Sequence, residues 1–350
     1  GAMRGAEIAA AGGHDMIMVG PPGSGKTSLA KAMVGIMPPL QLEESIETSK
    51  IYSIAGLHAS SFGLIRQRPF RAPHYSASLA AIIGGGNGEN ILPGEVSLAQ
   101  NGILFLDEFA QMPKSITEAL RGPIEDRKVV ISRLRSKVEF PASFMLVAAS
   151  NPCPCGYFGI KGRCTCTPAQ RQAYMSRLSG PILDRIDIQM TLHPVPTESL
   201  VHHRKCEPSR DVLLRVLAAR KIQSARFAGS GAFVNAGMSS EMIREFCPLD
   251  SESSSLMENM ASRLGLSARA FTRVLKLART IADLEEGCNL ITRRIYEETR
   301  QSPDGLQSAY PEWLTPERLN ATPLPSGFHD LAIQPRHILE ALGYRFLDRL

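Results

Sequence analysis

Residues 20–27 of the 350-residue chain read Gly-Pro-Pro-Gly-Ser-Gly-Lys-Thr, and they are the strongest indication of its fold. It follows a short apolar run, Asp15 to Val19, and precedes a segment whose apolar residues recur at helical spacing. A strand, a glycine-rich turn and a helix in this order form a phosphate-binding loop. The glycines let backbone N–H groups approach phosphate oxygens, and the helix N-terminus adds a positive dipole. We therefore predict an α/β domain that binds a nucleoside triphosphate.

A second apolar run, Ile103 to Leu106, ends in two carboxylates, Asp107 and Glu108. In sites of this kind Lys26 contacts the β- and γ-phosphates, and Thr27 and Asp107 support Mg²⁺. Glu108 then polarises the attacking water as general base. The alternative is a strand that ends in two solvated acids. The predicted nucleotide-contacting residues are Gly20, Pro21, Pro22, Gly23, Ser24, Gly25, Lys26, Thr27, Ser28 and Asp107.

Further strands are predicted at Phe144 to Ala149 and at Ile186 to Leu192, and the pattern is helical after about Ser209. Strands that alternate with helices indicate a mainly parallel α/β sheet. The predicted boundaries are a nucleotide-binding core over residues 1–196, with insertions at about 56–101 and 128–140, and a small all-helical domain over 197–350. The insertion at 128–140 has the pattern of a β-hairpin with a basic tip.

Within the helical domain, residues 267–286 carry apolar side chains at i, i+3 and i+4 spacing, with Ser267 as the N-cap. Gly287 and several prolines follow, so we expect an irregular surface insertion at about 287–333. A last helix is expected from about Pro335. Three basic residues at helical spacing are expected to form an exposed face, namely Arg273, Lys276 and Arg279.

The composition is that of an ordinary globular protein, with 43% hydrophobic and 21% charged residues. A formal net charge of +5 favours an anionic partner only weakly. No apolar run approaches the roughly 20 residues that span a bilayer. Seven cysteines, an odd number, without a visible secretory signal predict a reducing, cytoplasmic environment.

With both phosphate-site motifs present, the chain resembles the AAA+ superfamily. Longer stretches resemble its magnesium-chelatase-like group, and these are Pro69 to His74, Gly94 to Ala99, Asn151 to Gly156 and Ser179 to Asp187. Within that group the chain is similar to the bacterial ComM/YifB family, from about residue 4 to 286 and again from 333 to 350. The resemblance implies an AAA+ core that is followed by a helical lid.

The resemblance also implies roles for three residues. Asn151 matches sensor 1, which orients the hydrolytic water, and Arg269 matches the sensor 2 arginine, acting on its own or a neighbour's nucleotide. Arg185 matches the arginine finger that is presented to a neighbouring subunit's γ-phosphate. Such an arginine accelerates hydrolysis by a factor of about 10³–10⁵. Judged by the residues alone, Arg185 could equally form a structural ion pair with Asp184 or Asp187.

The implied assembly is a hexameric ring that hydrolyses ATP with Mg²⁺. The implied activity is a DNA helicase or translocase that migrates branches during natural transformation. Two features depart from the family pattern. The pattern places a further domain and the adenine-contacting segment before residue 4, which implies weakened ATP affinity here. The insertion at about 287–333 is longer than in the family.

Basic residues gather in the two predicted insertions of the core, which in the family project toward the ring pore. They are Arg66, Arg68, Arg71, Arg133, Arg135 and Lys137, with His74 close to the first cluster. Such side chains can follow the phosphates of single-stranded or branched DNA and release counterions. Few aromatic residues accompany them, so base stacking is expected to be minor. The alternative is a solvated basic face.

Four cysteines lie close together on a glycine-containing loop, and they are Cys153, Cys155, Cys164 and Cys166. Four thiolates can close a tetrahedral structural Zn²⁺ site, although spacing by one residue is less usual than Cys-x-x-Cys. Reduced thiols and disulfides are the two alternatives.

Three functions therefore compete. The leading one is an ATP-driven DNA motor. The second is a chelatase-type or protein-remodelling ATPase subunit that acts on a protein partner. The third is a nucleotide-dependent scaffold without catalysis, against which the full set Lys26, Asp107, Glu108, Asn151 and Arg185 argues.

Overall fold

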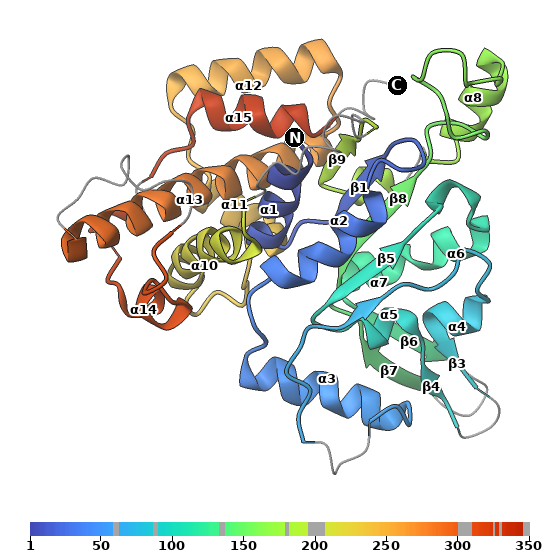
Figure 1. Cartoon of the computed structure of the whole chain (residues 1–350), viewed down its shortest axis with the longest axis horizontal. Helices are drawn as coiled ribbons and strands as arrows, with labels where there is room; N and C mark the ends of the chain where they lie inside the picture. Colours follow the sequence, from blue (N-terminus) through green and yellow to red (C-terminus); the bar gives the residue numbers. More distant parts are fainter. Residues whose placement is uncertain are drawn as a thin grey trace.

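The computed structural model describes residues 1–58, 63–86, 90–132, 137–178, 182–194, 207–299, 310–324, 326–328 and 331–345. An α/β part comes first in the chain, and a part made of helices follows it (Figure 1). This order confirms the predicted fold class.

A five-stranded parallel sheet forms the centre of the α/β part. In spatial order its strands are β2 (Phe70–Arg71), β5 (Ile103–Leu106), β8 (Met145–Ser150), β1 (Met16–Val19) and β9 (Ile188–Thr191). Alternate side chains face opposite sides, so Met16 and Met18 join one core cluster while Ile17 and Val19 join another. The strand β8 lies between β1 and β5, and this order brings the ends of all three strands together.

The α/β part also contains eight α-helices in the described ranges. They are α1 (Ala2–Gly12), α2 (Lys26–Met33), α3 (Leu42–Ile54), α4 (Leu79–Ile83), α5 (Glu95–Leu98), α6 (Lys114–Ala119), α7 (Arg121–Asp126) and α8 (Pro168–Met175). Single 3-10 turns stand at η1 (Val34–Ile36), η3 (Phe109–Gln111) and η4 (Leu183–Arg185). The predicted helix after the glycine loop therefore begins at Lys26 itself.

Two antiparallel hairpins stand apart from the main sheet. One pairs β3 (Gly84–Gly85) with β4 (Leu92–Pro93). The other pairs β6 (Lys128–Ser132) with β7 (Lys137–Pro141), which confirms the hairpin predicted over 128–140. Its tip, with Arg133 and Arg135, lies outside the described residues.

The C-terminal part contains α10 (Ser209–Arg226), α11 (Ser240–Phe246), α12 (Ser251–Leu264), α13 (Ala268–Thr299), α14 (Pro316–Ala321) and α15 (Pro335–Gly343), with the turn η5 (Asn235–Gly237). The Ser267 hydroxyl accepts a hydrogen bond from the Ala270 N–H at 3.1 Å, so Ser267 caps α13 as predicted. Figure 1 shows α10 and α13 beside α1, and these helices share one core cluster with the sheet.

The expected irregular insertion at 287–333 is wrong for its first third, because α13 runs on to Thr299. The residue that suggested a helix end, Gly287, serves a close approach instead. A Cβ at Gly287 would lie 3.0 Å from the Ala218 Cβ of α10, closer than side chains usually pack. Leu290, Ile291 and Ile295 then continue the buried face of the helix.

None of the helices in the described ranges is long and apolar enough to cross a membrane.

Candidate nucleotide site

The carboxyl ends of β1, β8 and β5 meet at one edge of the sheet, where open α/β folds bind ligands. A cleft of about 790 Å³ lies there, a volume typical of small-molecule sites. The sequence-predicted residues that line it are Pro22, Gly23, Ser24, Gly25, Lys26, Thr27, Ser28, Asp107, Glu108 and Asn151. The structure therefore brings the glycine loop, the acidic strand end and the sensor position together around one space.

The glycine loop has the conformation that a phosphate cradle needs. Gly23 and Gly25 have φ angles of 78° and 83°, a left-handed region that favours glycine. The Lys26 ammonium donates to the carbonyl oxygens of Gly20 at 2.5 Å and Pro21 at 2.9 Å, and burial lowers its pKa. Within the described part of the chain, the buried Ser24 hydroxyl has no hydrogen-bond partner. A loop with exposed N–H groups, a cation and an unused hydroxyl fits a polyphosphate.

Two groups that are suited to bind Mg²⁺, the Thr27 hydroxyl and the Asp107 carboxylate, lie next to each other in the cleft. The Thr27 hydroxyl donates to Asp107 Oδ2 at 3.2 Å, although the two residues are 80 positions apart. Asp107 Oδ1 accepts from the Glu108 N–H at 2.8 Å, which orients the carboxylate. A hydroxyl and a carboxylate are hard oxygen ligands, so this pair fits Mg²⁺.

Glu108 is held in an unusual backbone conformation, with a φ of 51°. Placing the backbone of a glutamate in the left-handed region costs free energy. Such strained conformations cluster at functional sites. Asn151 lines the same cleft, and its Oδ1 lies 3.4 Å from the Lys26 ammonium. This geometry suits the predicted water-activating role of Glu108 and the sensor role of Asn151.

The segment after β2 forms the opposite wall of the cleft, and His74 and Tyr75 line it. By its position in the sequence, His74 belongs with the basic residues of an insertion. The pairing of β2 with β5 carries its end to the same sheet edge as Asp107. Phe70 stacks on Phe105 with ring centroids 5.9 Å apart, which anchors the segment. The sequence carries no clear signal for this position, because β2 is only two residues long.

The predicted arginine finger and sensor 2 stand away from this cleft. Neither Arg185 nor Arg269 is among the described residues that line it. Arg269 is exposed in the first turn of α13. Arg185 is only 4% exposed, and its Nε donates to Glu125 Oε1 of α7 at 2.6 Å. Arg185 thus pairs with Glu125, a residue of another element, and Asp187 binds His14 and Arg273.

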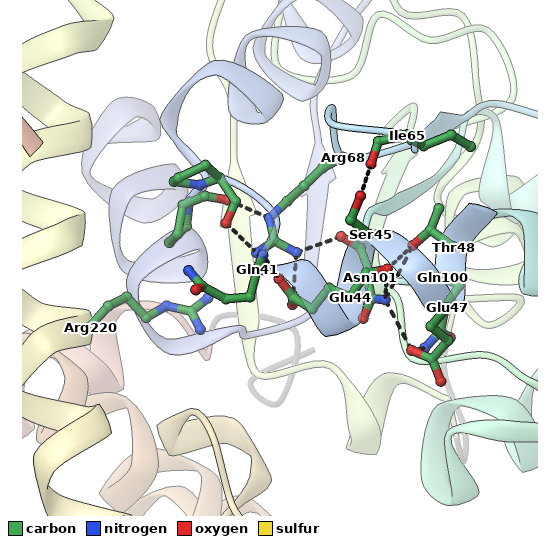
Figure 2. A network of polar contacts seen from close by, with 12 residues as sticks. Gln41, Glu44, Ser45, Glu47, Thr48, Ile65, Arg68, Gln100, Asn101 and Arg220 are labelled. Carbon is green, nitrogen blue, oxygen red and sulfur yellow. Dashed lines mark hydrogen bonds and ion pairs between the residues drawn. The ribbon is translucent and has the colours of Figure 1, made fainter. Parts of the chain in front are cut away.

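Two of the basic residues that were predicted to contact DNA have partners within the chain. Figure 2 shows Arg68 in a polar network with α3. Its Nε donates to the Pro38 oxygen at 2.5 Å, one terminal nitrogen donates to the Asn101 oxygen at 2.7 Å, and the other pairs with Glu44 at 3.0 Å. Arg68 therefore clamps the start of α3 to the chain around it.

Arg71 forms two parallel hydrogen bonds with Glu95, at 2.6 and 2.7 Å. Such bidentate pairing largely neutralises the charge. Both arginines therefore have structural partners within the chain, and their contact with DNA stays a prediction. Arg66 and Lys137 remain exposed, as a DNA-contacting residue would have to be.

The four clustered cysteines converge, since their Sγ atoms all lie within 4.8 Å of one another. Cys153 and Cys155 are 3.4 Å apart, and Cys164 lies 3.9 Å from the first and 3.7 Å from the second. Four sulfurs around Zn²⁺ at about 2.3 Å would be separated by about 3.8 Å, so the cluster fits the metal. These separations are too long for a disulfide. Backbone N–H groups of Tyr157 and Thr165 lower the pKa of Cys155 to about 6, which favours a thiolate.

The expected exposed basic face of α13 is wrong. Arg279 is 1% exposed and pairs with Asp283, Lys276 donates to the Ala236 oxygen at 2.8 Å, and Arg273 pairs with Asp187. Helical spacing alone cannot tell an exposed face from one whose partners come from other segments.

Comparison with known proteins agrees with this geometry. The family model described as magnesium chelatase, subunit ChlI, matches residues 1–200, and the model of its C-terminal part matches residues 206–298. The chain belongs to the magnesium chelatase family of AAA+ proteins. It contains an AAA+ core followed by a helical lid, and the family implies a nucleotide and Mg²⁺.

Several bacterial relatives are similar over most of the chain. The protein YifB of Escherichia coli is 45% identical over 298 residues, which cover 84% of this chain and 57% of the relative. The competence protein ComM of Haemophilus influenzae is 43% identical over 286 residues, covering 81% and 54%. A relative from Mycobacterium tuberculosis is 39% identical over 278 residues, covering 79% and 55%. The chain thus spans little more than half the length of these relatives.

Proposed function

We propose that the chain is an ATPase that hydrolyses ATP at the interface between subunits of a ring and uses the energy to move on DNA. The observation that carries the ATPase part is the convergence of Lys26, Thr27, Asp107, Glu108 and Asn151 on one cleft. A scaffold that only binds nucleotide has no need for Glu108 in a strained conformation beside the metal ligands.

In this proposal each cleft residue has one task. The loop N–H groups and Lys26 hold the phosphates, and Thr27 and Asp107 hold Mg²⁺, which neutralises charge on the phosphates when bound. Glu108 accepts the proton of the attacking water, and Asn151 orients that water. The cleft of one subunit lacks an arginine opposite the phosphates among its described lining residues, so Arg185 of a neighbour supplies that charge.

For Arg185 to act as a finger, its side chain has to change partners, which the sequence does not indicate. Arg185 is buried against Glu125 in the isolated chain. To reach a neighbour's phosphate, its guanidinium has to exchange the Glu125 carboxylate for a phosphate oxygen. The sensor 2 role of Arg269, exposed at the start of the lid helix, belongs to the same proposal.

DNA as the substrate is the finer part of the proposal. It is supported by the similarity to a protein named for competence, by the net charge of +5 and by the exposed Arg66 and Lys137. The hairpin β6–β7 and the insertion at 56–101 would line the pore of a hexameric ring. Arg133 and Arg135 stay in the proposal as residues of the hairpin tip.

The boundary between core and lid is placed at about residue 196. The two family models support this position, because the first ends at residue 200 and the second begins at residue 206.

The decisive experiment measures the steady-state ATPase rate against protein concentration, with and without single-stranded and branched DNA. A specific rate that rises with concentration, and further with DNA, supports both the shared site and the DNA motor. A rate that depends on concentration but ignores DNA retains the ATPase. It would shift the substrate to a protein, as in a chelatase-type or remodelling subunit. A constant specific rate contradicts the shared site.

We also propose that the cysteine cluster holds a structural Zn²⁺ beside the phosphate loop. A Cβ at Gly156, next to Cys155, would lie 3.1 Å from Pro22, so the cluster packs directly against that loop. Elemental analysis of protein purified without chelator should give one zinc per chain. The Cys164→Ser variant should lose it, whereas Cys247→Ser, at a cysteine buried elsewhere, should keep it. Wild-type protein without zinc would overturn this site.

A further inference from the structure

The short segment that carries Arg185 is held from the helical part of the chain. It consists of η4 and the residues up to β9, that is, residues 183–187. Asp187, two residues after Arg185, is 3% exposed and uses both carboxylate oxygens. Oδ2 lies 2.7 Å from His14 Nδ1, and Oδ1 accepts from Arg273 of α13. Both ends of the carboxylate are therefore fixed.

His14 links Asp187 to the same lid helix, α13, by a second route. Its other ring nitrogen, Nε2, lies 2.7 Å from the Thr280 hydroxyl, two turns beyond Arg273 on α13. His14 is fully buried and lies two residues after the end of α1. Asp187 thus binds α13 twice, once directly through Arg273 and once through His14 and Thr280.

The backbone of the segment is bound from a second lid element. Arg345, after α15, donates to the Ile186 oxygen at 2.6 Å and to the Asp187 oxygen at 3.4 Å. The Gln189 N–H donates to the Tyr344 oxygen at 2.7 Å. Burial alone would raise the pKa of Asp187, but Arg273 and His14 lower it well below its usual range. The carboxylate is therefore charged and its hydrogen bonds are charge-assisted.

We propose that Asp187 is a positioning residue for Arg185. Through Arg273 it ties the finger segment to the lid helix, so that the lid sets where the finger meets the neighbour's nucleotide. The inference rests on the proposed function, because it assumes that Arg185 acts in a neighbouring subunit. It goes beyond that function by naming the residues that place the finger, and it gives Arg273 a task separate from that of Arg269.

Mixed assemblies test this idea, since a finger and the site it serves lie on different subunits. Arg185→Ala chains have an intact site without a finger, and Glu108→Gln chains donate a finger but do not hydrolyse. An equal mixture should hydrolyse ATP about tenfold or more faster than Arg185→Ala alone, given the size of finger effects. A donor with both Glu108→Gln and Asp187→Asn should lose about nine-tenths of this restoration.

The control donor combines Glu108→Gln with Glu285→Gln. Glu285 lies on α13, the helix of Arg273. Like Asp187 it pairs with an arginine and a histidine, but its partners are Arg336 and His337 of α15. This donor should restore activity fully. A donor with Glu108→Gln and Arg273→Gln, a change at a partly exposed position, should fail like the Asp187→Asn donor. It decides the question even if Asp187→Asn does not fold.

The outcomes separate the two proposals. If Glu108→Gln chains restore nothing, the shared site itself is wrong. If they restore activity and the Asp187→Asn and Arg273→Gln donors do so equally well, the shared site stands and Asp187 does not position the finger. As acceptors of a finger, Asp187→Asn chains should be impaired about tenfold less than as donors, whereas a purely structural defect would impair both roles alike.

Discussion

The nucleotide edge of the sheet and the helix pair α10–α13 use polar residues in opposite ways. At the edge, the buried Ser24 hydroxyl has no hydrogen-bond partner among the described residues, and Glu108 has a strained backbone. Both features lower the free energy of unfolding in favour of a site. Between the helices, Asp283 is fully buried and accepts from Arg226 at 2.6 and 2.7 Å and from Asn235 at 2.7 Å. The first region is built to bind a ligand, and the second is built to hold the lid together.

The largest expected effect tests the first half of this comparison. Glu108→Gln should lower the kcat of ATP hydrolysis by about 10²–10⁴, because it removes the general base. The melting temperature should not fall, because glutamine has nearly the same size and shape as glutamate. Glu118→Gln, an exposed surface glutamate, is the control and should keep its rate. A Glu108→Gln protein that turns over normally would remove the residue from the mechanism.

The second prediction concerns the opposite region. Asp283→Asn should lower the free energy of unfolding by about 3–5 kcal/mol, because Arg226 and Arg279 would remain buried without their counter-charge. Urea unfolding measures this change. Glu298→Gln, which breaks an exposed pair with Arg294, should cost less than about 1 kcal/mol. Equal effects of the two variants would mean that the Asp283 network does not hold the lid.

A third, smaller effect tests how closely the two helices approach. Gly287→Leu should lower the free energy of unfolding by about 1–3 kcal/mol, because the new side chain meets Ala218 and the backbone of Ala219. Gly343→Ala, where a Cβ meets nothing within 4 Å, should change stability little. If Gly287→Leu were as stable as the wild type, α10 and α13 would not pack this tightly in solution.

The smallest effect separates two arginines of one insertion. Arg66→Ala should weaken DNA binding. It should also reduce the slope of the logarithm of the binding constant against the logarithm of salt concentration by about one, as expected for the loss of one phosphate contact. Arg71→Ala should leave that slope unchanged and lower the melting temperature, because it leaves Glu95 without its partner. Titrations at several salt concentrations measure the slope. The reverse pattern would place Arg71, rather than Arg66, at the DNA.

Much of the candidate site could be predicted from the sequence because its parts are contiguous. The glycine loop, the strand before it and the helix after it occupy one short stretch, and their chemistry is local. The same holds for the acids that follow Ile103 to Leu106. The parallel order of the strands then brings Thr27 within 3.2 Å of Asp107, as the two motifs together require.

The helical part could be predicted less well because its signals are ambiguous. Glycine ends helices often, yet it also allows two helices to approach, and only the position of Ala218 distinguishes these cases at Gly287. Likewise, arginines at helical spacing form an exposed face unless carboxylates from elsewhere meet them. Asp187 meets Arg273 across 86 residues of sequence.

The residues of the glycine loop were enough to predict a phosphate-binding loop at the end of a parallel strand, because backbone conformation and ligand chemistry there depend on adjacent residues. The tertiary structure alone decided which arginines are held by the fold and which are left for a ligand. Arg66, Arg68 and Arg71 look alike in the sequence, but Glu44 and Glu95 reach Arg68 and Arg71 from other elements, whereas Arg66 is exposed. The charge of a guanidinium is set by its residue type, whereas its availability depends on the carboxylates that folding brings within hydrogen-bond distance.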